Sequence, residues 1–284
     1  MDCEVAIYYN YLKINYNYKP VKKYLFMWEP ISVQPILYDK SYHKHFDKIF
    51  TFADDLVDNK KYFKINYAYL IPNCIPKDLS KKEHFCVLIA GNKTSRNKLE
   101  LYSQRIKTIR WFEKNHIESF DLYGIGWDKY IPHNYVMSGL YKKSPKWLRS
   151  LVDKFFNLPY KSYKGEIKYK YEVLVKYKFS ICYENIRDIN GYITEKIFHC
   201  FFAGCVPVYW GASNIEKYIP SNCFIDRRKF QNHESLYDYL INMSEREYIT
   251  YLDNIENYLN STKVSPFSAD VFVQDVIKKI LHEK

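Results

Sequence analysis

Hydrophobic and polar positions follow two different periods along this chain, and together they predict an α/β protein. In the first part, four short runs rich in β-branched and aromatic residues predict strands at 4–9, 24–28, 48–52 and 64–70. A stretch with two prolines and a run of charges at 72–83 indicates a linker. The chain therefore divides near residue 80.

A strand–helix–strand unit is predicted after the linker. Residues 85–90 form an apolar run, residues 97–115 carry hydrophobic side chains at helical spacing, and residues 120–123 form the next strand. Strands joined through a helix lie parallel in one sheet with a right-handed crossover. Residues 124–170 contain many turn formers and are expected to be irregular.

The segment 177–211 is predicted to form a strand, a polar loop, a helix and a second, buried strand. Thr194 is expected to cap the helix, whose first turn holds Glu195 and Lys196. A lysine at this position opposes the positive end of the helix dipole unless an anion lies nearby. Because α/β proteins bind phosphates where a helix starts beyond a strand's carboxyl end, the segment predicts an anion site. A strand at 223–226 and helices at 234–242, 245–259 and 269–284 complete the pattern.

The same segment resembles the α1,3/4-fucosyltransferase family, glycosyltransferase family 10. That family has a strand of the form YKFxLxFEN, then YVTEK, then G-x-VPV-x-x-G; here the pieces are YKFSICYEN at 177–185, YITEK at 192–196 and GCVPVYWG at 204–211. A short N-x-E segment at 214–216 and an F-I strand at 224–226 also match. Weaker resemblance extends from about residue 24 to about residue 230.

The resemblance implies a GT-B arrangement, in which two Rossmann-like domains face a cleft. We expect an N-terminal acceptor-side domain at 1–80, a GDP-sugar-binding domain at 84–266, and a C-terminal helix at 267–284 that packs back on the first domain. The first domain is expected to be small or incomplete, since 80 residues are few for a Rossmann-like domain.

The resemblance also implies which residues bind the donor, GDP-fucose. Glu195 would bind the ribose hydroxyls and Lys196 the ribose or a phosphate, while Asn185 and Tyr192 line the same pocket. Arg96, in the loop before the long helix, matches the arginine that contacts the β-phosphate, and a guanidinium can bind two phosphate oxygens at once.

Glu29 is the candidate general base. It follows a hydrophobic strand and precedes Pro30, so it should lie at a strand's carboxyl end facing the cleft, and it matches the glutamate of the family's E-P segment. The DDLVD run with Asp54, Asp55 and Asp58 looks like a metal motif, but the family places no chemistry there. We expect a capping cluster or a solvated turn at these aspartates, no metal site, and no cofactor requirement.

Composition narrows the picture less than the motifs do. The net charge is +11, which suits nucleic acid, an anionic membrane or an anionic substrate, but the lysines are scattered. The 30 tyrosines could stack on bases, yet they lie mainly in core-patterned segments, so nucleic-acid binding is not expected.

Seven cysteines without a C-x-x-C pair favour a reduced, cytosolic chain. Neither a signal peptide nor a membrane span is visible, and the apolar side of the last helix could dock within the chain, as we expect, or on a membrane.

The predicted function is that of an inverting fucosyltransferase. L-Fucose would move from GDP-fucose to a hydroxyl of an N-acetylglucosamine or glucose unit of an oligosaccharide, in α1,3 or α1,4 linkage, as in lipopolysaccharide or glycan decoration. Two alternatives stay open at this point: a transferase with another GDP-sugar or acceptor, and a non-catalytic carbohydrate-binding remnant.

Overall fold

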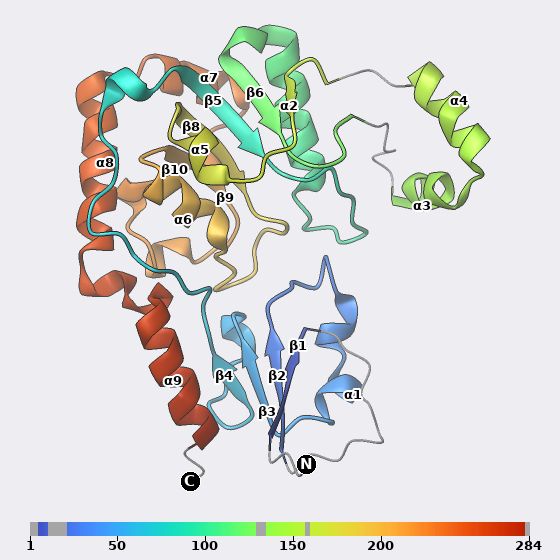
Figure 1. The fold of residues 1–284 in the computed structure, drawn as a ribbon, viewed down its shortest axis with the longest axis vertical. Coiled ribbons are helices and arrows are strands. Elements are labelled where there is room, and N and C mark those ends of the chain that lie inside the picture. Colours follow the sequence, from blue (N-terminus) through green and yellow to red (C-terminus); the bar gives the residue numbers. More distant parts are fainter. Residues whose placement is uncertain (1–4, 11–21, 129–134, 157–159, 282–284) are drawn as a thin grey trace.

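The computed structural model describes residues 5–10, 22–128, 135–156 and 160–281, and its strands form two parallel sheets (Figure 1). This confirms the predicted α/β class. Residue 4 of the first predicted strand and residues 282–284 of the last predicted helix lie outside the described residues. Within those ranges, no helix has the length and apolar character needed to cross a membrane.

The smaller sheet is built from the N-terminal part of the chain. Its four parallel strands are adjacent in chain order: β1 (Val5–Tyr9), β2 (Lys22–Met27), β3 (Lys48–Thr51) and β4 (Tyr62–Lys64). Side chains of β2 alternate between the two faces. Leu25 and Met27 pack in one apolar cluster beside the short helix α1 (Lys40–His43), whereas Tyr24 and Phe26 pack in another on the opposite face.

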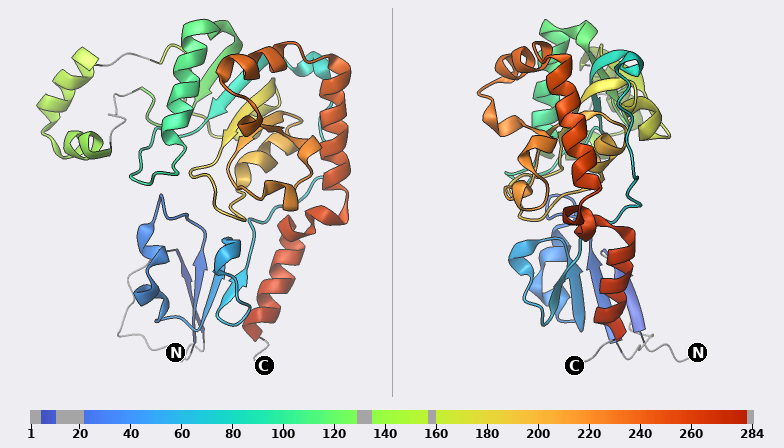
Figure 2. Two further views of the ribbon diagram at one scale, coloured as in Figure 1. Left: turned by 180° about the vertical axis from the view of Figure 1, so that it is seen from behind. Right: turned by 90° about the vertical axis from the view of Figure 1, so that its left-hand side faces the viewer.

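The last helix, α9 (Ala269–Leu281), covers that second face (Figure 2). Its Val276 is buried in the cluster, with Phe272 and Ile280 packed at the edge. The ring of Phe272 lies 5.8 Å from that of Trp28. The apolar side of this helix therefore packs within the chain.

The larger sheet has six parallel strands in the order β10-β9-β8-β5-β6-β7. Their bounds are β5 (His84–Ile89), β6 (Phe120–Tyr123), β7 (Tyr163–Gly165), β8 (Tyr177–Tyr183), β9 (Val206–Trp210) and β10 (Ile225–Asp226). The chain runs from β5 to one edge and returns through β8 to the other. The strand order thus reverses between β5 and β8, which is where α/β sheets bind ligands.

Helices lie on both sides of this sheet (Figures 1 and 2). The helices α5 (Lys170–Leu174) and α6 (Glu195–Phe202) lie on one side, and α2 (Tyr102–Asn115) lies on the other with α7 (His233–Ile241). The helix α8 (Glu245–Leu259) contacts α6 and β9. Parallel strands need such crossover helices, and both faces of the sheet are covered as a result.

Three predicted elements differ from the structure. The fourth strand was predicted at 64–70, whereas the observed strand β4 ends at Lys64. It ends there because its neighbour β3 ends at Thr51, which pairs with Lys64. Further along the chain, Tyr69 hydrogen-bonds to the backbone at 267–269. The helix predicted at 97–115 begins at Tyr102, because residues 99–101 hydrogen-bond to the backbone at 185–187.

The segment predicted to be irregular, 124–170, contains two further helices. These are α3 (Tyr135–Lys143) and α4 (Lys146–Phe156), which project from the side of the larger sheet (Figure 1). The turn-forming residues around these two helices made their helical pattern hard to recognise in the sequence.

The contact between the two sheets depends on an aspartate that was expected to be solvated. The carboxylate of Asp54 accepts hydrogen bonds from Lys64 Nζ (2.6 Å), Asn214 Nδ2 (2.7 Å) and Tyr218 Oη (2.6 Å). The expectation of a solvated turn is wrong for Asp54, because residues distant in sequence meet it here. The expectation fits Asp58, whose carboxylate accepts three backbone N–H groups of its own turn.

Gly191 lets the loop after β8 approach this contact. Its φ is +79°, and an added Cβ would lie 2.4 Å from both Lys64 Nζ and the carbonyl oxygen of Phe52. Neither the backbone conformation nor the space suits any other residue. The loop that leads to α6 is thereby held against the smaller sheet.

Candidate functional site

A cleft of about 660 Å³ lies at the point where the strand order of the larger sheet reverses. Its walls include the end of β5 and the residues after it (89–93), the segment that follows β6 (residues 124–126), Asn185 after β8, and the start of α6. Trp28 and Glu29, which follow β2 of the smaller sheet, form part of the opposite wall. The cleft therefore joins the carboxyl ends of strands from both sheets.

The start of α6 is organised by Glu184, a carboxylate that is fully buried. Glu184 accepts hydrogen bonds from the backbone N–H of Thr194 (2.8 Å), from its hydroxyl (2.7 Å) and from Lys196 Nζ (3.0 Å). Thr194 is the N-terminal cap residue, as predicted, but its hydroxyl serves Glu184 and makes no capping hydrogen bond. The sequence analysis gave Glu184 no role. The signal that could have identified it was its position next to Asn185, at the end of the strand that resembles the family motif.

Two opposite charges lie side by side on the first turn of α6. Burial alone lowers the pKa of Lys196, but the carboxylates of Glu184 and Glu195 raise it above its ordinary value, so Lys196 is a cation at neutral pH. Burial would raise the pKa of Glu195, yet Lys196 and Lys170 lower it to about 2. Lys170 Nζ lies 3.2 Å from Glu195 Oε1. The first turn of α6 can therefore bind hydroxyl groups through the carboxylate of Glu195 and an anion through the ammonium group of Lys196.

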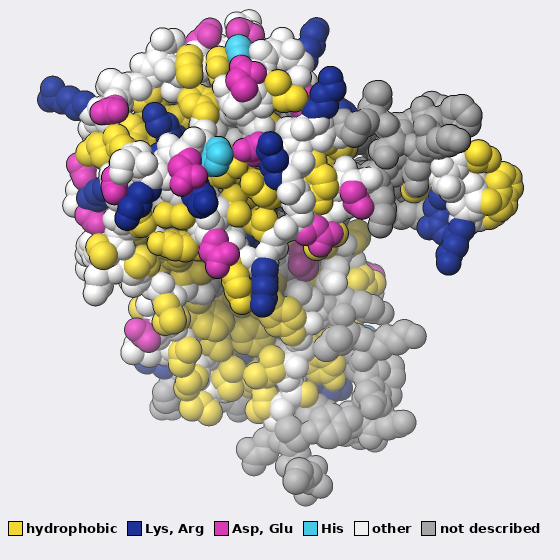
Figure 3. Space-filling model, turned by 45° about the horizontal axis from the view of Figure 1, so that its top comes forward, with side chains coloured by type: hydrophobic (Ala, Val, Ile, Leu, Met, Phe, Trp, Pro, Cys, Tyr) yellow, Lys and Arg dark blue, Asp and Glu magenta, His cyan; other side chains and the backbone are white. Residues whose placement is uncertain are grey.

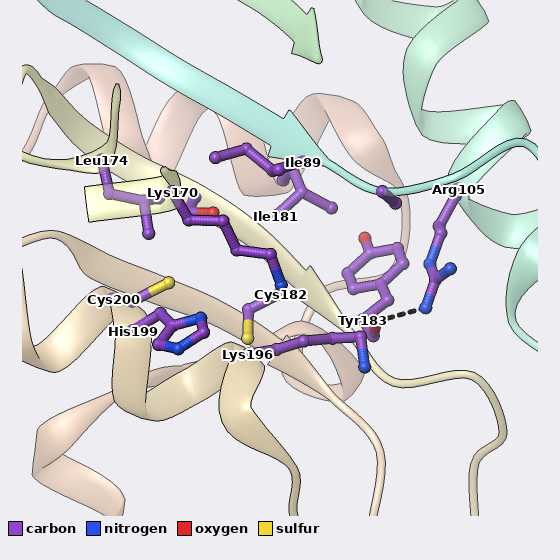
Figure 4. Close-up of a pocket in the computed structure, with 12 residues that line it drawn as sticks. Ile89, Arg105, Lys170, Leu174, Ile181, Cys182, Tyr183, Lys196, His199 and Cys200 are labelled. Atoms are coloured by element: carbon purple, nitrogen blue, oxygen red, sulfur yellow. Dashed lines mark hydrogen bonds between the residues drawn. The ribbon is translucent and has the colours of Figure 1, made fainter. Parts of the chain in front are cut away.

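Arg105 is a cleft residue that sequence reasoning missed. From α2 it donates through Nη2 to the carbonyl oxygens of Tyr183 and Glu184 (both 2.7 Å) and to Oδ1 of Asn185 (3.1 Å). Figure 4 shows it with Lys170 and Lys196 around a small cavity of about 20 Å³ beside the cleft. The available signal was its helical spacing, because Arg105 falls three residues after Tyr102 on the predicted apolar face.

Glu29 faces the cleft from the smaller sheet. The backbone N–H groups of Trp28 and Glu29 donate to Oδ1 of Asn10 (2.8 and 3.2 Å), which fixes the chain as it leaves β2. Burial raises the pKa of Glu29, while Lys93 and Lys196 act in the opposite direction. A carboxylate with a raised pKa is a better proton acceptor than an ordinary one.

The structure brings five of the six predicted site residues to one cleft: Glu29, Asn185, Tyr192, Glu195 and Lys196. The ring of Tyr192 packs 4.8 Å from that of Phe52 in the smaller sheet.

The sixth, Arg96, is exposed and does not line the cleft. Lys93, from the same loop, does line it. The phosphate-binding role of Arg96 stays a prediction.

An apolar groove continues from the cleft along the smaller sheet. It encloses about 450 Å³ and shares Tyr9, Trp28 and Tyr67 with the cleft, adding Phe26 and Phe272. The rings of Trp28 and Tyr67 lie 5.0 Å apart, and the hydroxyl of Tyr67 donates to the carbonyl of Trp28 (2.5 Å). The groove therefore presents a row of aromatic side chains beside Glu29.

Positive charge at the site comes from side chains. Lys93, Arg105, Lys168, Lys170 and Lys196 all line the cleft. Among the residues that the structure describes, no three His, Cys, Asp or Glu side chains form a cluster that could hold a metal ion. The arrangement can bind an anion such as a diphosphate and supply a carboxylate base on the facing wall.

Comparison with known proteins connects the site to one family. Residues 151–272 match the family model described as glycosyltransferase family 10 (fucosyltransferase) C-term. The chain is 35% identical over 96 residues to an α-(1,3)-fucosyltransferase of Helicobacter pylori, covering 34% of this chain and 20% of that protein. It is 39% identical over 64 residues to an α-(1,4)-fucosyltransferase of Arabidopsis thaliana, covering 22% and 16%. A GDP-fucose protein O-fucosyltransferase 3 of Danio rerio is 34% identical over 116 residues, covering 37% and 25%. The matched segments thus span a quarter or less of these relatives.

Solved structures share the fold. An α1,3-fucosyltransferase crystallised with GDP aligns with a TM-score of 0.54 at 16% identity, covering all of this chain and 79% of the other. Anabaena HepE in complex with UDP and glucose aligns with a TM-score of 0.55 at 9% identity, covering 92% and 71%. These likenesses confirm the predicted GT-B-like fold. Residues 151–272 are similar to glycosyltransferase family 10, the fucosyltransferase family, and the relatives named as fucosyltransferases agree with that match.

Proposed function

We propose that this chain is an inverting fucosyltransferase that takes L-fucose from GDP-fucose. The observation that carries the proposal is the cleft in which Glu29 of the smaller sheet faces the charged first turn of α6. The fucosyltransferase family model matches residues 151–272, and parts of the chain are similar to relatives named as α-(1,3)- and α-(1,4)-fucosyltransferases. The proposed division is acceptor side at 1–80, donor side at 84–266 and helix at 267–284, in a cytoplasmic protein.

The donor would bind to the larger sheet. Glu195 would accept hydrogen bonds from the ribose hydroxyls, and Lys196 would contact the ribose or a phosphate, with Asn185 and Tyr192 lining the pocket. Arg96 is proposed for the β-phosphate. The fixed geometry behind this turn supports the proposal, because Glu184 holds Lys196 and Arg105 holds Asn185. No divalent metal is required in this scheme, since cationic side chains and the start of α6 balance the diphosphate.

Glu29 would act as the general base. Its carboxylate takes the proton of the acceptor hydroxyl while the hydroxyl oxygen bonds to the anomeric carbon of fucose. The bond from that carbon to the diphosphate oxygen breaks at the same time, and GDP leaves with the electron pair. A single displacement of this kind inverts the anomeric carbon. The raised pKa of Glu29 supports this role.

The acceptor would lie along the aromatic groove. Tyr9, Trp28 and Tyr67 connect this groove to the cleft, so a sugar ring placed against them would point a hydroxyl toward Glu29. Flat apolar rings suit the C–H faces of a pyranose. An N-acetylglucosamine or glucose unit, linked α1,3 or α1,4 to the fucose in lipopolysaccharide or a glycan, is the proposed acceptor.

A second candidate keeps the donor and changes the acceptor. The match to a protein O-fucosyltransferase favours a polypeptide hydroxyl as the alternative. The groove and Glu29 would then bind a serine or threonine side chain instead of a sugar. The two candidate functions differ only in the acceptor, and therefore in the fucosylated product.

The test is incubation of the purified chain with GDP-fucose and N-acetyllactosamine, with and without EDTA. We expect GDP release and a fucosylated product with or without the chelator, and an anomeric proton signal that reports inversion. Glu29→Gln should abolish the product while leaving GDP binding intact, and Glu83→Gln, an exposed glutamate elsewhere, should change neither. Absence of both product and GDP binding would contradict the proposal. GDP binding with transfer only to a polypeptide would favour the second candidate.

A further inference from the structure

The arm formed by α3 and α4 carries apolar side chains on its surface. Leu140 is 62% exposed, Trp147 65%, Leu148 37% and Leu151 45%. None of the four hydrophobic clusters of the described residues includes these side chains. Figure 3 shows hydrophobic side chains beside lysine and arginine side chains at the end of the arm, on the right. Exposed apolar side chains gathered in this way mark an interaction surface.

The helix α4 is amphipathic. Trp147, Leu148 and Leu151 follow the i, i+1, i+4 spacing that gathers side chains on one side of a helix. Lys146 and Ser150 are exposed at the remaining positions. A helix of a globular protein normally turns such an apolar side toward the core, whereas this one turns it outward.

The charge of the arm indicates what covers its apolar side. Residues 135–156 contain five lysines and arginines and one acidic residue. A second copy of this chain would bring the same positive charge against itself, which disfavours pairing of two arms. Basic residues beside exposed Trp and Leu side chains are instead the composition of helices that lie in the interface of an anionic membrane.

The position of the arm relates it to the cleft. It leaves the larger sheet between β6 and β7, and the chain on either side of it contributes to the cleft wall, at residues 124–126 before it and at 167–168 and 170 after it. A surface bound to the arm would therefore lie near the cleft entrance.

We propose that α3 and α4 form a docking arm for the surface of an anionic lipid bilayer. The apolar side of α4 enters the interface between headgroups and acyl chains, and the basic side chains contact the anionic headgroups. Docking of this kind would bring the cleft close to molecules held at that surface. It does not depend on sugar transfer and can be tested apart from it.

The test is co-sedimentation of the whole chain with vesicles of phosphatidylcholine alone or mixed with phosphatidylglycerol. We expect binding to the anionic vesicles that weakens as salt is added. The double variant Trp147→Glu and Leu151→Glu should reduce the bound fraction at least about tenfold, because charge replaces the inserting side chains. Leu70→Glu and Ile241→Glu are matched controls, since both residues are exposed and apolar but lie outside the arm, and they should bind as the native chain does.

Tryptophan fluorescence provides a second measurement. Anionic vesicles should shift the emission of the native chain to the blue, and Trp147→Phe should lose most of that shift while still sedimenting. The proposal is overturned if the native chain does not bind anionic vesicles or binds neutral vesicles equally well. It is also overturned if the double variant binds anionic vesicles as well as the native chain does while its circular dichroism spectrum is unchanged. Self-association of the native chain that the double variant abolishes would also overturn it, since a second copy would then cover the arm.

Discussion

Replacing Glu184 by glutamine tests whether a buried carboxylate holds the start of α6. The native carboxylate is fully buried and accepts three hydrogen bonds, one of them from the ammonium of Lys196, whose side chain is 17% exposed. Glutamine has nearly the same shape but only one acceptor oxygen. Whichever way its amide turns, either the Thr194 backbone N–H or the Lys196 ammonium loses its acceptor.

The magnitude follows from these contacts. A hydrogen bond to a charged group contributes about 1.5–3 kcal/mol, and removing one partner of a buried ion pair costs about 3–5 kcal/mol. Lys196 keeps part of its solvation and a second carboxylate, Glu195, at 4.0 Å, so the lower end applies. We expect Glu184→Gln to lower the free energy of unfolding by about 3 kcal/mol, a factor of roughly one hundred in the folding equilibrium.

Urea denaturation followed by circular dichroism measures this change, and a double-mutant cycle isolates the pair. Lys196→Met alone should also destabilise the fold, and the double variant should be more stable than additivity predicts by about 2 kcal/mol, because neither charge is then left unpaired. Glu216→Gln, at an exposed glutamate, should stay within about 0.5 kcal/mol of the native chain. A loss below about 1 kcal/mol for Glu184→Gln, or full additivity in the cycle, would refute the reasoning.

Three further predictions concern the interface, the base and the metal requirement. Gly191→Ala should lower the free energy of unfolding by more than about 2 kcal/mol, because its Cβ would meet an ammonium and a carbonyl at 2.4 Å; Gly165→Ala, at φ +115° with open space, isolates the backbone cost and should lose less. Lys93 lowers the pKa of Glu29, and only the deprotonated base is active, so Lys93→Gln should move the acid limb of kcat/KM to higher pH; an unmoved limb, or the same shift in Lys98→Gln, would contradict this. EDTA should leave the rate of GDP release unchanged, and a loss restored by added Mn²⁺ would show that cationic side chains do not suffice.

How much could be predicted from the sequence differs between the two walls of the cleft. The strand, loop, helix and strand at 177–211 were predicted with nearly their observed bounds, because period-2 and period-3.6 patterns report directly on which side chains of one element are buried. The helix predicted from residue 97 begins five residues later, because pairing with the chain after β8 overrides the local pattern. The two helices of the arm were not predicted, since turn formers flank and interrupt them.

The site shows the same division between local pattern and packing. Local sequence by itself placed Glu195 and Lys196 on a first helical turn and Glu29 at a strand end. That these groups face one cleft was implied by the family resemblance and not by the local pattern; the tertiary structure brings them together although they are far apart in the sequence and belong to different sheets. It also decided that Asp54 joins the two sheets and that Arg105 binds backbone carbonyls, since the partners of a polar side chain depend on which elements pack together. The local backbone conformation and the burial of a side chain depend on residues that are neighbours in the sequence. Contacts between charged groups that are distant in the sequence depend on how the elements pack.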